Sequence, residues 1–209
     1  MLVDKKENRI LQTKSIVVFL FLDEYMKLEN SVRNIFQVKS LTMPLEKKQI
    51  LYFYHGGEIG TQMDSSTDSI MLKEVKYSPT DKFITFSFAK IMRLNERYDL
   101  FDDLNFSIPS IRNKFTDLEF SGCAQKLIKM RNELAHNITS VTFKEQAIIE
   151  SLNDDLFTKA KEDSPLLANI DTSLMDDMTK HIATNLIYLE KINKALSEKN
   201  KWIIDNSQM

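Results

Sequence analysis

The scarcity of glycine and proline is the feature that most limits what this chain can fold into. There are 4 Gly and 4 Pro in 209 residues, well below their usual shares of about 7% and about 5%. A β-sandwich or barrel needs many tight turns, and these two residues supply such turns most readily. The sequence therefore predicts an all-α fold, a bundle of five to six helices.

Composition bounds the size and environment of that bundle. A chain of 209 residues with 43% hydrophobic residues can bury a core, and we expect one domain over 1–209. The longest apolar run, 16–22, is far shorter than the roughly 20 residues of a membrane span. Cys123, as the single cysteine, excludes an internal disulfide, and no secretory signal is evident. The three histidines are scattered, which argues against a metal site. We expect a cytoplasmic protein with no membrane contact.

Apolar residues recur at spacings of three and four along most of the chain, as in amphipathic helices. The first such pattern covers residues 7–36, and a break follows at 40–44. The sequence predicts further helices over 79–97, 109–136, 143–161 and 172–198.

The region 45–78 admits more than one interpretation. Residues 45–55 lie between Pro44 and a Gly-Gly pair, as a helix would, but the aromatic cluster within them suits a strand equally well. Residues 60–68 predict a surface loop, with a short strand over 70–77. We treat 40–78 as an insertion or irregular segment, with a short β-hairpin or a loop over 45–78.

Charge is unevenly distributed, although the net charge is −2. Basic side chains exceed acidic ones over 82–131, whereas acids dominate 145–178. Such blocks usually form solvated faces; alternatively, the basic region meets an anionic ligand. Four cations are candidate contacts to an RNA backbone, namely Arg93, Arg97, Lys126 and Lys129. Glu96 beside the first two also permits a plain salt bridge.

Arg131 begins the segment that stands out as a candidate site. Its helical neighbours three and four residues away are all apolar: Leu127, Ile128, Leu134 and Ala135. We therefore expect this arginine beside the buried seam, where a guanidinium needs an anionic or carbonyl partner.

His136 is expected in the last turn of the same helix, because Asn137 suits a left-handed cap. The negative end of the helix dipole favours its protonated form, and Asn132, four residues earlier, can orient the imidazole. Arg131 and His136 lie about 140° apart around an ideal helix. They meet at one ligand, such as a phosphate, only through the long Arg side chain, an irregular helix end or a neighbouring subunit. In the alternative, structural interpretation, His136 caps the helix and Arg131 forms a core salt bridge.

The segment Arg131-Asn-Glu-Leu-Ala-His136 resembles the signature of the HEPN superfamily. That signature is an Arg, usually followed by a polar residue, and then a His after four to six intervening positions. In the family the motif lies toward the end of one helix of a small bundle. The resemblance covers about 80–198 in architecture and six residues in motif.

This resemblance implies a metal-independent endoribonuclease, commonly a toxin or phage-defence effector that acts as a dimer. It implies an RNA substrate, no cofactor and a 2′,3′-cyclic phosphate product, since the ribose 2′-oxygen attacks the adjacent phosphate. His136 would transfer protons, Arg131 would stabilise charge on the phosphoryl oxygens, and Asn132 would hold the imidazole or a phosphate oxygen. A homodimer that pairs the ends of two 109–136 helices would let each subunit complete the other's site.

The resemblance also implies an alternative function and a partner. Some HEPN proteins are catalytically inactive modules that bind RNA, a nucleotide or a protein. Toxin members imply an antitoxin or another defence-system protein as partner. Those silenced by a nucleotidyltransferase often carry Tyr two residues after the His, where this chain has Ile138, so the resemblance does not extend to that mode of control.

Overall fold

The computed structural model describes residues 5–54, 86–136 and 145–207, which form a helical bundle with one small hairpin. The six α-helices in these ranges are α1 (Lys5–Thr42), α2 (Leu45–Tyr54), α4 (Phe88–Tyr98), α5 (Phe120–His136), α6 (Asp154–Glu162) and α7 (Asp177–Ser207). Strands β1 (Ser107–Pro109) and β2 (Asp117–Glu119) pair antiparallel, and 3₁₀ turns occur at 102–104, 145–147 and 172–174. The predicted all-α bundle is confirmed. None of the described helices combines the length and apolarity needed to cross a membrane.

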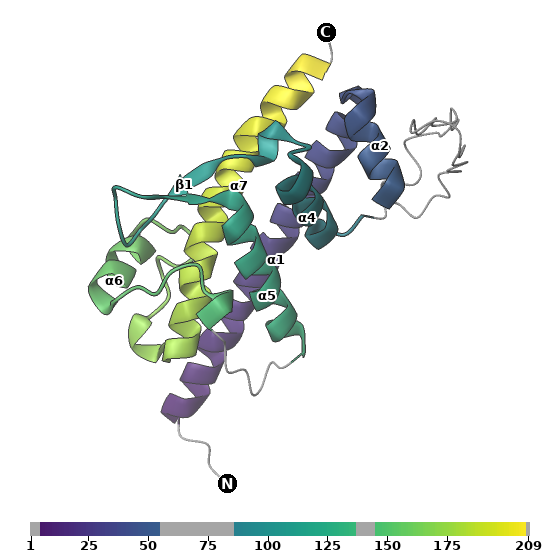
Figure 1. The fold of residues 1–209 in the computed structure, drawn as a ribbon. Coiled ribbons are helices and arrows are strands. Elements are labelled where there is room, and N and C mark those ends of the chain that lie inside the picture. The colour runs from purple at the N-terminus through teal and green to yellow at the C-terminus, as the bar shows by residue number, and fades with distance from the viewer. Residues whose placement is uncertain (1–4, 55–85, 137–144, 208–209) are drawn as a thin grey trace, which may run out of the picture.

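The long helices α1 and α7 lie side by side and form the spine of the bundle (Figure 1). They run in the same direction, because their contacts advance together along both helices. Lys14 Nζ lies 3.9 Å from Asp176 Oδ2, and further along Asn193 Nδ2 donates to Glu24 O at 3.0 Å. The shared face is apolar and recurs at spacings of three and four; on α1 it includes Val17, Phe21, Leu28, Val32 and Ile35.

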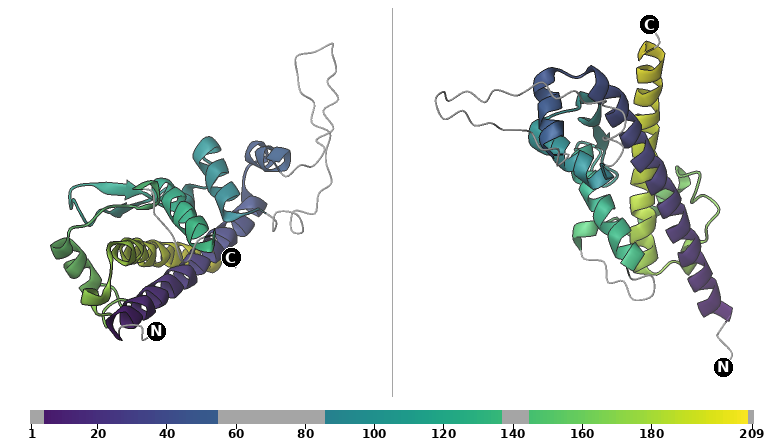
Figure 2. Two further views of the ribbon diagram at one scale, coloured as in Figure 1. Left: turned by 90° about the horizontal axis from the view of Figure 1, so that it is seen from below. Right: turned by 90° about the vertical axis from the view of Figure 1, so that its right-hand side faces the viewer.

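Helix α5 runs antiparallel to this pair and carries the chain back along it (Figures 1 and 2). Asn185 of α7 contacts Met130 of α5, whereas Lys199, further along α7, lies over the Phe106 ring just before the hairpin that leads into α5. Helix α4 packs beside α5 and against α1. The buried residues of α5 are Phe120, Cys123, Ala124, Leu127, Met130 and Leu134.

The predicted helix over 109–136 is wrong in its first part. Ile108 is buried between two exposed neighbours, the alternation of a strand, and β1 pairs with β2. In the connecting turn, Asn113 Oδ1 accepts a hydrogen bond from Phe115 N at 3.1 Å. Such side-chain bonds to the backbone compete with helix formation. Helix α5 therefore begins at Phe120.

The helix predicted over 143–161 is also too long. Ile148 and Ile149 are buried but not helical. Helix α6 begins at Asp154, where Asn153 Oδ1 accepts from Leu156 N at 2.9 Å and so caps the first turn.

The helix predicted over 172–198 is α7, which starts later and ends later. Residues 172–174 form a 3₁₀ turn. Asp176 Oδ1 then accepts from Thr179 N at 2.7 Å, as a capping residue does.

In the first half of the chain, the predicted helices agree with the structure over the described residues. The helix over 7–36 lies within α1, Pro44 separates α1 from α2, and the helical interpretation of 45–55 is confirmed by α2. The helix predicted over 79–97 corresponds to α4, which begins at Phe88, and residues 79–85 lie outside the described residues. The predicted loop at 60–68 and strand at 70–77 lie outside the described residues. The described hairpin is at 107–119, and the hairpin or loop expected over 45–78 lies, beyond α2, outside the described residues.

Candidate functional site

The Arg131–Asn132 pair lies on the last turns of α5, and both side chains are exposed. Arg131 Nη1 donates to Asn132 Oδ1 at 3.3 Å. The helix is fixed beneath them, because Met130 and Leu134 are buried in the core. A guanidinium and an amide are thus presented to solvent from a rigid element.

Arg131 lies beside the buried seam as expected, but its side chain is exposed, so the expectation of a buried guanidinium is wrong. Of its four apolar helical neighbours, Leu127 and Leu134 are buried, but Ile128 is half-buried and Ala135 is exposed. The arginine therefore lies at the edge of the seam, and its long side chain carries the charge out into water. This exposure also contradicts the structural interpretation in which Arg131 forms a core salt bridge.

Helix α5 is described as far as His136, and the predicted helix end after it lies outside the described residues. The side chain of His136 and the cap at Asn137 lie outside them too, as does the expected contact of the imidazole with Asn132. Because α5 stays helical up to this residue, Arg131 and His136 begin about 140° apart around the axis. The two side chains are therefore not brought together by an irregular helix end before position 136.

Tyr25 of α1 lies near Arg131. Burial raises the pKa of Tyr25 and Glu29 raises it further, while the positive charge of Arg131 lowers it. The ring packs edge-on against Phe88 of α4, with centroids 5.8 Å apart. Tyr25 therefore joins α1 and α4 beside the candidate site; in the sequence it looks like one more core residue of its helix.

Glu133 carries an unusual carboxylate two residues after Arg131. Its Oε2 atom is buried, and among the described residues it has no hydrogen-bond partner. An unpaired buried carboxylate oxygen is costly. Nothing in the spacing of the sequence singles out this glutamate.

Helix α4 presents a cationic hollow of about 350 Å³, lined by Ser87, Lys90, Arg93, Leu94 and Arg97. The two arginines, both predicted RNA contacts, are exposed and lie on one face of the helix. Lys90, which sequence reasoning missed, is three residues before Arg93 and shares that face, so helical spacing could have identified it. We refer to this feature as the α4 hollow.

The other two predicted RNA contacts lie on α5 and differ from each other. Lys126 Nζ donates to the backbone carbonyl of Ile149 at 3.0 Å and is half-buried. Lys129 is exposed. The two helices meet where Gln125 Nε2 donates to Glu96 Oε2 at 2.7 Å, so Glu96 bonds to α5 in addition to neighbouring the arginines.

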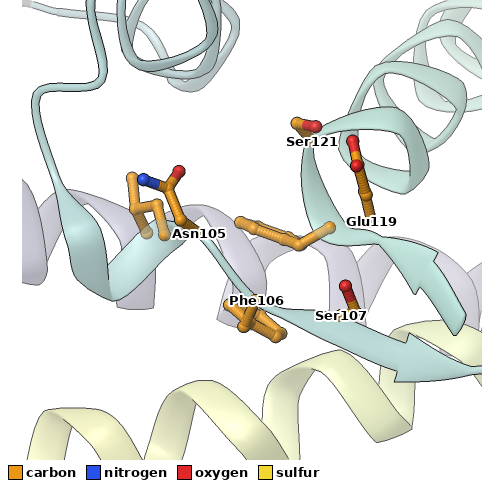
Figure 3. Close-up of a pocket in the computed structure, with 7 residues that line it drawn as sticks. Asn105, Phe106, Ser107, Glu119 and Ser121 are labelled. Carbon is orange, nitrogen blue, oxygen red and sulfur yellow. The ribbon is translucent and has the colours of Figure 1, made fainter.

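A second hollow, of about 340 Å³, lies between the hairpin and the start of α5 (Figure 3). Asn105, Ser107, Glu119 and Ser121 line it together with Phe106 and Phe120, whose rings stack with centroids 4.6 Å apart. Its charged lining residue is an acid, so this hollow fits a phosphate less well than the α4 hollow does.

Cys123 and the acidic residues offer little further chemistry. Cys123 is buried, and burial raises the pKa of its thiol to about 11, so the thiol stays protonated and is a poor nucleophile. Within the described ranges, no three His, Cys, Asp or Glu side chains gather as a metal-ligand set.

Comparison of the chain with protein-family models, with curated proteins and with solved structures found no match.

Proposed function

We propose that this chain is a metal-independent endoribonuclease that acts through Arg131, Asn132 and His136. The supporting observation is the exposed Arg131–Asn132 pair on a core-anchored helix that reaches His136. The resemblance of these residues to the HEPN motif supplies the reaction class. The reaction would use no cofactor.

The proposed reaction is an internal transesterification. The ribose 2′-oxygen attacks phosphorus as its proton leaves, the bond from phosphorus to the 5′-oxygen breaks, and that oxygen takes up a proton. The products are a 2′,3′-cyclic phosphate and a 5′-hydroxyl. His136 would carry the protons. Arg131 would stabilise the charge that develops on the nonbridging oxygens, and Asn132 Nδ2 would donate to one of them.

The α4 hollow is the proposed contact for the RNA backbone beyond the scissile phosphate. Lys90, Arg93 and Arg97 follow one helix face, and α4 packs beside α5, which carries Lys129 and Arg131. Cations arranged in this way release counterions when they meet successive phosphates. Neutralising Arg93 and Arg97 would weaken RNA binding and reduce its dependence on salt.

The biological setting follows from the resemblance alone. It suggests a cytoplasmic toxin or antiviral defence effector that works as a homodimer and is controlled by an antitoxin or another defence-system protein.

Purified protein should cut single-stranded RNA in the presence of EDTA and leave 2′,3′-cyclic phosphate ends. DNA of the same sequence should survive, because it lacks the 2′-oxygen. His136→Ala should lower the rate by about 10²–10⁴-fold and Arg131→Ala by about 10²–10³-fold. His181→Ala changes the same residue type elsewhere and should leave the rate unchanged.

Equal inactivity of wild type and His136→Ala on a broad RNA panel would contradict the catalytic proposal. If both proteins still bound RNA, a nucleotide or a protein partner, the inactive-module alternative would replace it.

A further inference from the structure

The turn that joins β1 to β2 carries an apolar ring that the proposed ribonuclease site does not use. Phe115 is 98% exposed, more than any other large hydrophobic residue in the described part of the chain, where Phe19 follows at 67%. A single exposed apolar side chain is common on protein surfaces. The surroundings of Phe115 set it apart, because its segment is ordered and basic.

The hairpin turn, residues 110–116, is fixed from within by its own polar groups. Ser110 N donates to Thr116 O at 3.0 Å, and Thr116 N donates to Asn113 O at 3.0 Å. Ser110 Oγ accepts from Asn113 N at 2.9 Å, while Asn113 Oδ1 accepts from Phe115 N at 3.1 Å. The backbone that carries the ring is therefore bonded, and the turn holds Phe115 out in water.

Two residues outside the hairpin turn join it to the rest of the molecule. Tyr188 of α7 is buried, and its hydroxyl accepts from Ile111 N at 2.7 Å. Glu150 accepts from Ser110 Oγ at 2.7 Å and from Arg112 N at 3.2 Å. A segment fixed in this way has little backbone freedom left to lose when it binds a ligand.

Arg112 and Lys114 give the hairpin turn a positive charge beside the ring. Both are exposed, and neither forms a salt bridge with another described residue, Glu150 included. The turn itself contains no acid, and the first one after it, Asp117, begins β2. Charge complementarity therefore favours an anionic ligand that also offers a flat apolar surface.

We propose that the hairpin turn binds single-stranded RNA, with Phe115 stacked on a base and Arg112 and Lys114 at the neighbouring phosphates. A single strand supplies both parts, because its unpaired bases are joined by an anionic backbone. The proposal rests on the proposed function for the choice of RNA as the ligand.

The small apolar area of the hairpin turn favours RNA over other ligands. Stable membrane contact takes a broad apolar helix face, or a lipid chain together with a polybasic patch, and the turn exposes one ring. A standard protein interface buries about 800 Å² on each side, whereas the neighbours of Phe115 in the turn are polar. One ring between two cations matches one base between two phosphates.

The hairpin belongs to the same layer as the candidate site. In Figure 2 the hairpin, α5 and α4 lie together on one side of α1 and α7. Phe115 lies four residues before the end of β2 and Arg131 eleven residues into α5, so at most about 35 Å separates their backbones. A strand bound at Arg131 reaches the hairpin turn after several nucleotides. Phe115 is therefore a remote contact that adds affinity.

The first test measures binding of the full chain to a labelled RNA single strand of about 12 nucleotides by fluorescence anisotropy. The RNA carries 2′-O-methyl groups, so it cannot be cut and the result does not depend on cleavage. Phe115→Ala should weaken binding by about 5–150-fold, whereas Phe115→Trp should bind at least as tightly as wild type. Phe19→Ala removes an exposed ring from α1 and is the matched control, with unchanged affinity.

The second test separates stacking from charge. Phe115→Ala should leave the affinity for a duplex of the same sequence unchanged, because paired bases have no free face to stack. Arg112→Gln and Lys114→Gln should each lower the slope of log affinity against log salt concentration by about 0.7. Phe115→Ala should leave that slope unchanged.

The outcomes distinguish this contact from the cleavage reaction. Equal affinity of wild type and Phe115→Ala for the single strand would overturn the contact, even if the wild type cuts RNA. Binding that depends on Phe115, in a chain that cuts no RNA, would support the contact and reject cleavage alone. If anionic lipid vesicles bound wild type but not Phe115→Ala while RNA affinity was equal, the turn would be a membrane contact and the RNA proposal would fail.

Discussion

Polar side chains differ between two regions of the molecule, the contact of residues 145–150 with α7 and the end of α5. Against α7 they are buried and bonded. Asn185 is fully buried; its Nδ2 donates to Ala147 O at 2.8 Å, and its Oδ1 accepts from Ile149 N at 3.0 Å. At the end of α5, Arg131 and Asn132 are exposed and bond to each other.

The difference separates buried polar groups that hold the fold from exposed polar groups that the proposed function assigns to binding. A buried amide that meets the backbone groups around it fixes an otherwise irregular segment, and its loss leaves those groups unpaired. An exposed guanidinium or amide contributes little to folding.

The largest expected difference between the two regions is in the free energy of unfolding, when one asparagine from each is replaced by alanine. Asn185→Ala should lower the free energy of unfolding by about 3 kcal/mol, because the Ile149 N–H and the Ala147 carbonyl lose their partner in the core. Asn132→Ala should change it by less than about 0.5 kcal/mol. Urea unfolding of both proteins measures the difference.

The rate of RNA cleavage should rank the same two variants in the reverse order. Asn132→Ala should slow RNA cleavage, whereas Asn185→Ala should keep the wild-type rate per folded molecule. If the two variants lost similar stability, the proposed division between structural and binding asparagines would be wrong.

The sequence predicted which segments are helical better than it predicted the residues at which those helices begin. The spacing of apolar residues identified α1 and α7 because each buries a continuous stripe along its length. The same spacing misled at 109–119 and 145–153, where the apolar residues lie in a turn, a short strand or an irregular segment. In those places local bonds of polar side chains, such as the cap at Asn153, decide where a helix begins.

The candidate site was predictable as a set of residue types along a helix, but its exposure was not. Spacing placed Arg131 and Asn132 correctly on α5 and gave the arginine apolar neighbours. Whether its guanidinium is enclosed depends on what packs beside that turn, which is a tertiary property. The closeness of Tyr25, from α1, depends in the same way on the packing of distant segments.

The carboxylate of Glu150, in the segment that packs on α7, predicts that the stability of the fold depends on pH. Glu150 accepts hydrogen bonds from Tyr188 Oη, from Ser110 Oγ at 2.7 Å and from Arg112 N at 3.2 Å. Burial raises its pKa, but these bonds outweigh burial and hold the pKa below its usual 4.5. A lowered folded-state pKa means that Glu150 stabilises the fold above about pH 4.5 and loses this effect as the pH falls through the folded value.

Glu150→Gln should therefore cost about 1–2 kcal/mol at neutral pH and progressively less as the pH falls below 4.5. Urea unfolding of wild type and variant across that range measures the change. Asp176, whose pKa is also lowered, acts in both proteins, so the difference between them isolates Glu150. If the difference in the free energy of unfolding between wild type and Glu150→Gln did not depend on pH, the charge of the Glu150 carboxylate would have no role in stability.

The smallest expected effect separates two lysines on the same helix. Lys126 donates to Ile149 O at 3.0 Å from a half-buried position, so Lys126→Met should lower the free energy of unfolding by about 1 kcal/mol. Lys129 is exposed, and Lys129→Met should leave stability within about 0.5 kcal/mol of wild type. RNA affinity at two salt concentrations should respond in the opposite way: if Lys129 meets a phosphate, its loss reduces the salt dependence of binding, and the loss of Lys126 does not. Equal losses of salt dependence would place Lys126 at the RNA surface despite its bond to the backbone.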